Sequence, residues 1–168
     1  KKEFKRVGLY DNMIRFPAFP GGWRGCRDSH IAIMRMAQYD DMVEIFEDDV
    51  RFIDVLSIYQ ATAELPEDWD VLYYGGSPQE PQEQYSKHLY YARNVLCMHA
   101  YAITNNNGCI DFILEHKKDI AKIDAYFAHV IQSYFKCFLV RPPACIQKQY
   151  SSDTCKRSDV STIIKNCQ

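Results

Sequence analysis

The sequence predicts an α/β fold in which a mixed, mostly parallel sheet is flanked by helices. Short apolar runs typical of buried strands alternate along the chain with amphipathic segments typical of helices. The chain has 168 residues, of which 47% are hydrophobic and 25% charged. A chain of this length buries a substantial core, and its composition excludes wholesale disorder. We therefore treat residues 1–168 as a single domain.

The first half of the chain alternates strands with helices. Strands are expected at residues 13–16, 42–46 and 69–74. A helix is expected to begin at Asp28 or Ser29, because either side chain can cap it. A second helix is expected to begin at Asp54 and to end near Pro66, since proline cannot continue a helix.

The second half begins with a polar, proline-containing loop at 77–87 that is suited to act as a lid. Strands are expected at 89–92, 96–104 and 137–140, one helix is expected to start near Cys109, and another is expected at 123–135. The turn at 105–108 can cap the helix that begins near Cys109. Residues 145–168 are polar, and we expect an irregular tail there.

Charge and cysteine content limit the environment and the partners. The net charge is −2, which gives no general reason to expect nucleic acid as a partner. No apolar run approaches the roughly 18 residues of a membrane span, and we expect no transmembrane segment. The seven cysteines form no C-x-x-C pair, so free thiols in a reducing compartment are favoured, with disulfides left open among Cys145, Cys155 and Cys167. A bacterial or viral cytoplasmic protein is favoured over one in the endoplasmic reticulum lumen, which also fits.

The strongest chemical signal is the carboxylate triplet Glu47-Asp48-Asp49, which directly follows the apolar strand at 42–46. Ligands of open α/β sheets gather beyond the carboxyl ends of strands. Three adjacent carboxylates repel one another, and a hard divalent cation with oxygen ligands relieves that repulsion. The alternative is an exposed acidic loop, paired with Arg51.

Six segments in a fixed order resemble one enzyme family. They are G-C-R-D-S-H at 25–30, E-D-D-V-R-F at 47–52, D-W-D-V-L-Y-Y-G at 68–75, A-Y-A-I-T at 100–104, I-D-A-Y-F at 123–127, and P-P at 142–143 followed by S-D at 152–153. Over about residues 13–153 the chain resembles glycosyltransferase family 25. That family includes bacterial lipooligosaccharide galactosyltransferases and procollagen galactosyltransferases.

The resemblance implies a GT-A-like fold that binds a nucleotide sugar, usually a UDP-hexose, together with Mn2+ or Mg2+. It implies transfer of galactose or glucose, with inversion, to a hydroxyl of a glycan, glycolipid or protein, as in lipopolysaccharide biosynthesis or collagen glycosylation. The chemistry is consistent, because a cation that bridges the two phosphates stabilises the departing diphosphate. The partners expected are thus the donor and its acceptor.

The resemblance also suggests roles for the acidic residues. Asp49 is expected to be the main metal ligand and part of the catalytic centre. Glu47 and Asp48 are expected to share the roles of second ligand and contact to the ribose or diphosphate. Asp124 is the candidate base that deprotonates the acceptor hydroxyl, with a plain helix cap as the alternative.

Four further residues have two interpretations each. His30 either contacts donor or acceptor, or holds the start of a helix. Gly75 and Gly76 allow close approach of a ligand to the backbone, but a turn requires glycines equally. Asp153 either meets the diphosphate or metal, or belongs to a solvated tail.

One departure from the family pattern leaves a second hypothesis open. Residues 1–6 resemble the helix that follows the family's first nucleotide-binding strand, so that this strand is missing from the sequence. A degenerate, non-catalytic member that acts as a binding or interaction domain is therefore the alternative function. A phosphoryl-transfer enzyme or nuclease is less favoured, because no second acidic cluster stands at a suitable distance for a two-metal site.

Overall fold

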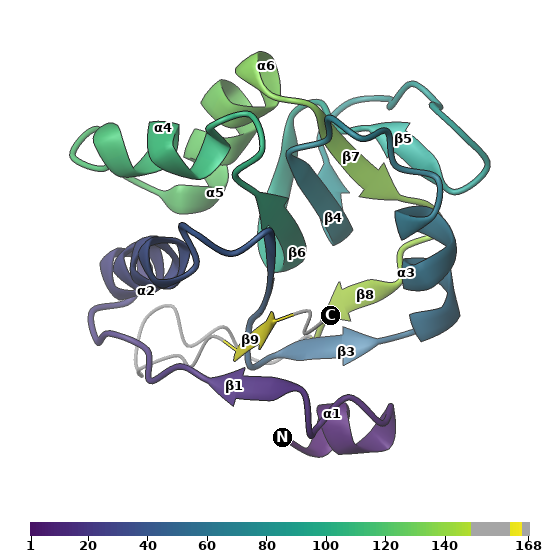
Figure 1. Cartoon of the computed structure of the whole chain (residues 1–168), viewed down its shortest axis with the longest axis horizontal. Helices are drawn as coiled ribbons and strands as arrows, with labels where there is room; N and C mark the ends of the chain where they lie inside the picture. Colours follow the sequence, from purple (N-terminus) through teal and green to yellow (C-terminus); the bar gives the residue numbers. More distant parts are fainter. Residues whose placement is uncertain (149–161, 166–168) are drawn as a thin grey trace.

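The computed structural model describes residues 1–148 and 162–165. Its main sheet has seven strands in the order β1-β9-β2-β6-β4-β7-β5 (Figure 1). Their bounds, in that order, are Met13–Arg15, Thr162–Lys165, Met42–Phe46, Val95–Thr104, Val71–Pro78, Cys137–Val140 and Leu89–Tyr91. A second sheet pairs β3 (Val50–Phe52) with β8 (Cys145–Gln147).

The main sheet is mixed but mostly antiparallel, so the expectation of a mostly parallel sheet was wrong. Among the described strands, only β4 and β7 pair in parallel. The reason is the position of β6, which lies between β2 and β4 and runs antiparallel to both. Strands β2, β4 and β7 therefore share one direction, as the alternation with helices suggested, but the long β6 separates the first two.

Helices cover one face of the sheet, and a smaller layer covers the other (Figure 1). The first face packs against α2 (Trp23–Met36), α4 (Cys109–Glu115) and the helical run α5 (Ile123–Tyr126), η1 (Phe127–Ile131) and α6 (Gln132–Tyr134). The second face packs against α1 (Lys2–Arg6), α3 (Val55–Thr62) and the small sheet of β3 and β8. Strand β4 serves both cores, because its side chains alternate between the faces: Val71 and Tyr73 lie in one core, and Leu72 and Tyr74 in the other.

The two expected helix starts have different outcomes. Asp54 is the N-cap of α3, and its side chain accepts a hydrogen bond from the Leu56 backbone N–H at 3.0 Å. Asp28 and Ser29 were wrong as starts, because α2 begins at Trp23, and both residues lie inside it. Ser29 uses its hydroxyl instead to donate to the Gly25 carbonyl and to accept from the Phe19 N–H.

Several strand boundaries also differ from expectation. Strand β4 continues through Gly75 and Gly76 to Pro78, with register shifts against β6. The tail expected to be irregular contributes β8 and β9. The loop after β4 is tied down near its end by Glu64, whose carboxylate accepts hydrogen bonds from the Ser86 hydroxyl and from the His88 backbone N–H at 2.9 Å.

No disulfide joins two of the five cysteines in the described part of the chain, namely Cys26, Cys97, Cys109, Cys137 and Cys145. The last three are buried. None of the helices in the described part of the chain has the length and apolar character needed to cross a membrane.

Candidate functional site

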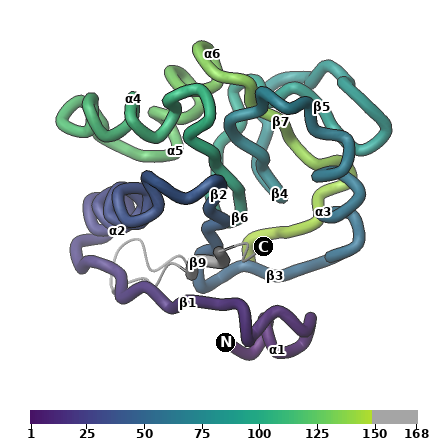
Figure 2. The backbone as a smooth tube through the Cα atoms, viewed as in Figure 1, coloured from purple at the N-terminus to yellow at the C-terminus, as the bar shows by residue number. Residues whose placement is uncertain are grey.

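The acidic residues form a turn at the end of β2, which we call the acidic turn (Glu47–Asp49). The Glu47 N–H donates to the His99 carbonyl of β6 at 2.9 Å, so the backbone hydrogen bonding between β2 and β6 extends to this residue. The Val50 N–H then donates to the Glu47 carbonyl at 3.3 Å, which closes the turn and starts β3. The backbone thus leaves β2 and enters the small sheet within four residues (Figure 2). Asp48, in the middle of the turn, is exposed.

Glu47 points from the turn towards α2. Its Oε1 lies 3.4 Å from Nε2 of His30 and 3.7 Å from Sγ of Cys26. The Glu47 side chain is 22% exposed, whereas that of His30 is fully buried. Burial acts to raise the pKa of Glu47, but the hydrogen bond with His30 and its electrostatic effect, with help from His99 and Cys26, outweigh burial and lower it. Glu47 is therefore the acid of the turn that ionises most readily.

Asp49 faces β8 and lacks a full set of partners. Its Oδ2 accepts a hydrogen bond from the Gln147 amide at 2.8 Å. Its Oδ1 is buried and has no hydrogen-bond partner among the described residues. Burial raises the pKa of Asp49 to about 6, the charges of Glu47 and Asp48 add to the rise, and the Gln147 hydrogen bond opposes it. Among the described residues, Asp49 is thus a carboxylate without a paired cation.

A cavity of about 320 Å³ adjoins the acidic turn. Glu47 and Asp48 line it on one side, and the cationic side chains of Lys2 and Arg15 also line it. The charge of Arg15 acts to lower the pKa of Asp48, although burial and Glu47 raise it overall. This volume falls within the range of about 300–1,000 Å³ that is typical of small-molecule sites.

Asp124 belongs to α5, and its charge acts on one of the side chains that the acidic turn also affects. Burial and then the charges of Asp124, Glu47 and Asp49 raise the pKa of the Cys97 thiol. Asp124 is not the N-cap of α5, because Lys122 holds that position. Its Oδ1 accepts from the neighbouring Ala125 N–H at 2.8 Å. The candidate base and two of the candidate metal ligands therefore share an electrostatic effect on the Cys97 thiol.

The glycines of β4 have a packing role in this structure. A Cβ on Gly75 would lie 2.0 Å from the Cys145 carbonyl oxygen and 2.8 Å from Nε2 of His99. A Cβ on Gly76 would lie 2.5 Å from a Val95 methyl group. Asp153 lies outside the described residues.

Sequence reasoning missed the partners that surround Glu47. Cys26 stands one turn before His30 on α2, and this spacing was a signal that both side chains share a face. His99, only 4% exposed, carries two ring nitrogens without a hydrogen-bond partner of good geometry in the described part of the chain. Burial lowers the pKa of His99, while the charge of Glu47 and the Cys145 backbone oppose that effect. Nothing in the sequence marks His99, because its position depends on the pairing of β6 with β2.

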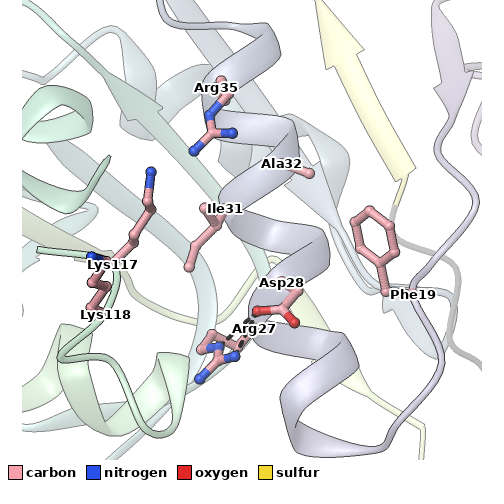
Figure 3. A pocket seen from close by; sticks show the side chains of 8 residues that line it. All are labelled: Phe19, Arg27, Asp28, Ile31, Ala32, Arg35, Lys117 and Lys118. Atoms are coloured by element: carbon pink, nitrogen blue, oxygen red, sulfur yellow. Dashed lines mark hydrogen bonds and ion pairs between the residues drawn. The ribbon is translucent and has the colours of Figure 1, made fainter. Parts of the chain in front are cut away.

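A second hollow of about 440 Å³ lies on another face of α2, and we call it the basic groove (Figure 3). Arg27, Arg35, Lys117 and Lys118 line it, with Ile31 between them. Arg27 is already engaged, since it pairs with Asp28 at 2.8 Å and donates to the Ile120 carbonyl at 2.9 Å. Helix α2 therefore presents one face to the acidic turn and another to a cationic surface.

Comparison with known proteins adds no assignment. The chain matches no family model, and no curated protein is significantly similar to it. The function is therefore argued from the residues of the site and from the motifs of the sequence.

Proposed function

We propose that the protein is a metal-dependent inverting glycosyltransferase that moves galactose or glucose from a UDP-sugar to a hydroxyl of a glycan, glycolipid or protein. The observation that carries this proposal is the state of Asp49. This carboxylate has a raised pKa and a buried oxygen with no hydrogen-bond partner in residues 1–148, and it stands in a turn with two more acids. Such a group lacks the positive charge that a bound cation supplies.

The donor chemistry of the acidic turn suits a hard divalent cation, but its three carboxylates do not converge on one point in this structure, so binding would require them to turn towards one another. The three residues supply only carboxylate oxygens, which Mn2+ and Mg2+ prefer. Asp49 and Asp48 would hold the ion, with Glu47 as a further ligand. When bound, the ion would act as a Lewis acid on the diphosphate and stabilise the charge that the leaving group gains. Lys2 and Arg15, which line the adjoining cavity, are suited to bind the phosphate oxygens.

Asp124 is suited to the role of base. What supports this role is that its charge acts on the same thiol, Cys97, as the charges of Glu47 and Asp49. An inverting transfer requires a group that accepts the proton of the acceptor hydroxyl while the hydroxyl attacks the sugar. We assign that proton to the carboxylate of Asp124, and the binding of donor phosphates to the acidic turn and its cavity.

A donor screen tests the proposal. The chain is incubated with UDP-, GDP- and CMP-sugars, with and without Mn2+, and release of the nucleoside phosphate is measured. We expect turnover of a UDP-hexose only with the metal, its loss in Asp49→Asn, and its retention in Asp41→Asn, which removes an exposed acid just before β2.

Two results would contradict the enzyme proposal. Binding of UDP with Mn2+ but no turnover of any donor would identify a non-catalytic binding domain. If no donor is turned over and UDP with Mn2+ does not raise the melting temperature, the proposal that the protein binds a nucleotide is rejected as well.

A further inference from the structure

We propose that Cys26, His30 and Glu47 form a second cation site, selective for a thiophilic divalent ion such as Zn2+. One donor atom from each residue, a sulfur, a ring nitrogen and a carboxylate oxygen, lies within 4.8 Å of the other two. This donor set shares Glu47 with the acidic turn but adds sulfur and nitrogen to its oxygen, and it needs no nucleotide sugar. The inference therefore does not depend on the glycosyltransferase proposal.

The three ligands come from rigid elements. Cys26 and His30 stand four residues apart on α2, so their side chains project from the same face of the helix. Glu47 is held by its backbone hydrogen bond to β6 directly after β2. Ligands on a helix and at a strand end keep their positions better than ligands on a loop.

The two distances to the Glu47 oxygen match those of tetrahedral zinc, and the third, between nitrogen and sulfur, is within 4.8 Å. Bonds of about 2.1 Å to nitrogen or oxygen and about 2.3 Å to sulfur place nitrogen and oxygen about 3.4 Å apart and sulfur and oxygen about 3.6 Å apart. In the structure the His30 nitrogen lies 3.4 Å, and the Cys26 sulfur 3.7 Å, from the same Glu47 oxygen. The side chains would need little movement to bind the ion.

His30 also has the outer contact that orients a ligating imidazole. Its Nδ1 lies 2.8 Å from the Tyr101 hydroxyl, and the two rings stack with centroids 5.7 Å apart. This contact leaves Nε2 directed at Glu47. Histidines that bind metal almost always use their second ring nitrogen for such a hydrogen bond, which fixes the orientation of the ring.

Charge and proton balance favour a divalent ion. The Cys26 thiol releases one proton to solvent on binding and becomes a thiolate, while the neutral imidazole of His30 carries its proton on Nδ1. Thiolate and carboxylate together supply two negative charges, which Zn2+ neutralises. Water can complete the coordination from the side on which Glu47 is 22% exposed.

Sulfur and imidazole ligands select Zn2+ over Mn2+ and Mg2+. Other thiols are poor competitors within the described residues, because burial raises the pKa of Cys109, Cys137 and Cys145. Cys97 is part-exposed and lies near the same carboxylates, which makes it the matched control for Cys26.

The test is metal binding by the full chain, reduced and freed of metal with a chelator. Zn2+ is titrated against a competing chromophoric chelator, and Co2+ is used as a spectroscopic probe for the thiolate-to-metal charge-transfer band. We expect one tight equivalent of Zn2+ and a charge-transfer band in the wild type and in Cys97→Ser. Cys26→Ser keeps the size and hydrogen bonding of the side chain but should lose the band and most of the affinity. Tyr101→Phe should weaken binding about 10–100-fold, the usual effect of losing an outer contact.

Circular dichroism of each variant establishes that it is folded before binding is compared. The proposal is overturned if the wild type shows no charge-transfer band, if Cys26→Ser binds as the wild type does, or if the band depends on Cys97, Cys155 or Cys167 instead. None of these measurements requires catalysis. Absence of zinc binding would therefore not count against the transferase proposal, and absence of sugar transfer would not count against the zinc site.

Discussion

Replacing Asp49 by asparagine should make the metal-free protein more stable at neutral pH and should abolish its response to Mn2+. Burial disfavours the ionised form of this side chain, and one of its oxygens has no partner among the described residues. Asparagine has nearly the same shape and can still accept the hydrogen bond from Gln147, but it carries no charge. A site that is costly to the empty protein becomes favourable only when a cation binds there.

The magnitude follows from the raised pKa. The value rises from 3.8 to about 6 in the folded protein. A difference of about 2 units corresponds to an upper limit of about 3 kcal/mol, and partial exposure to solvent reduces the expected value to about 1–2 kcal/mol. Because the folded protein holds this proton more tightly than the unfolded chain, the stability that the proton confers is present below pH 3.8 and is lost as pH rises through about 6.

The assay is thermal unfolding of wild type and Asp49→Asn with a chelator present, at a series of pH values from 4 to 7.5. At the acid end the two proteins should differ little. At pH 7 the variant should unfold about 2–8 °C higher, given the usual 2–4 °C per kcal/mol for a chain of this size. Added Mn2+ should raise the melting temperature of the wild type but not that of Asp49→Asn, and the control Asp41→Asn should respond to Mn2+ as the wild type does.

The reasoning would be refuted by a variant that is less stable than the wild type at pH 7. A stability difference that is equal at pH 4 and pH 7 would refute it as well. Either result would mean that the packing of Asp49, and not its charge, determines its effect.

Four further perturbations test other parts of the account. Asp124→Asn should lower kcat by about 10²–10⁴-fold with little change in UDP affinity, as measured by initial rates and calorimetry, and an unchanged kcat would exclude it as the base. Zn2+ should inhibit sugar transfer by the wild type but not by Cys26→Ser, because the proposed zinc site withdraws Glu47 from the acidic turn. Equal inhibition of both proteins in rate assays would show that zinc bound at Cys26 does not affect the acidic turn. Gly75→Ala should destabilise the protein by about 1–3 kcal/mol or more in urea unfolding, since its methyl group would meet a backbone oxygen, and wild-type stability would contradict that contact. Glu64→Gln should lower stability at pH 7, because hydrogen bonds from Ser86 and His88 hold the Glu64 pKa at about 2; the deficit should shrink as pH falls from 4.5 towards 2, and a constant deficit would argue against ionisation as its cause.

Local chemistry in the sequence predicts single elements well. The apolar run 42–46 predicts β2 with its observed bounds, and the side chain of Asp54 predicts the start of α3. Strand order was not predictable in this way. The pattern of β6 is that of a buried strand in any position, and only long-range pairing places it between β2 and β4. Short strands such as β3 and β8 carry too few residues for a pattern to emerge.

The candidate site likewise has one part that the sequence predicts and another that it does not. The acidic turn is visible in the sequence because its three acids are contiguous. The contacts of Glu47 are not, since they depend on how α2 packs beside the end of β2. His99 and Tyr101 come from β6, so their place beside the acids follows from the strand order that the sequence did not reveal.

The place of β9 has a consequence for how the protein is made. Met13 of β1 pairs with Ile164, and Glu44 of β2 pairs with the same residue on its other side. A ribosome that has finished both early strands must therefore add more than a hundred residues before the strand that joins them exists. Until β9 is made, β1 and β2 each have an edge whose backbone groups lack this pairing partner. Contacts between residues so distant in sequence also form slowly. Nascent chains stalled before residue 162 should consequently depend on chaperones and aggregate when released, whereas full-length chains should not.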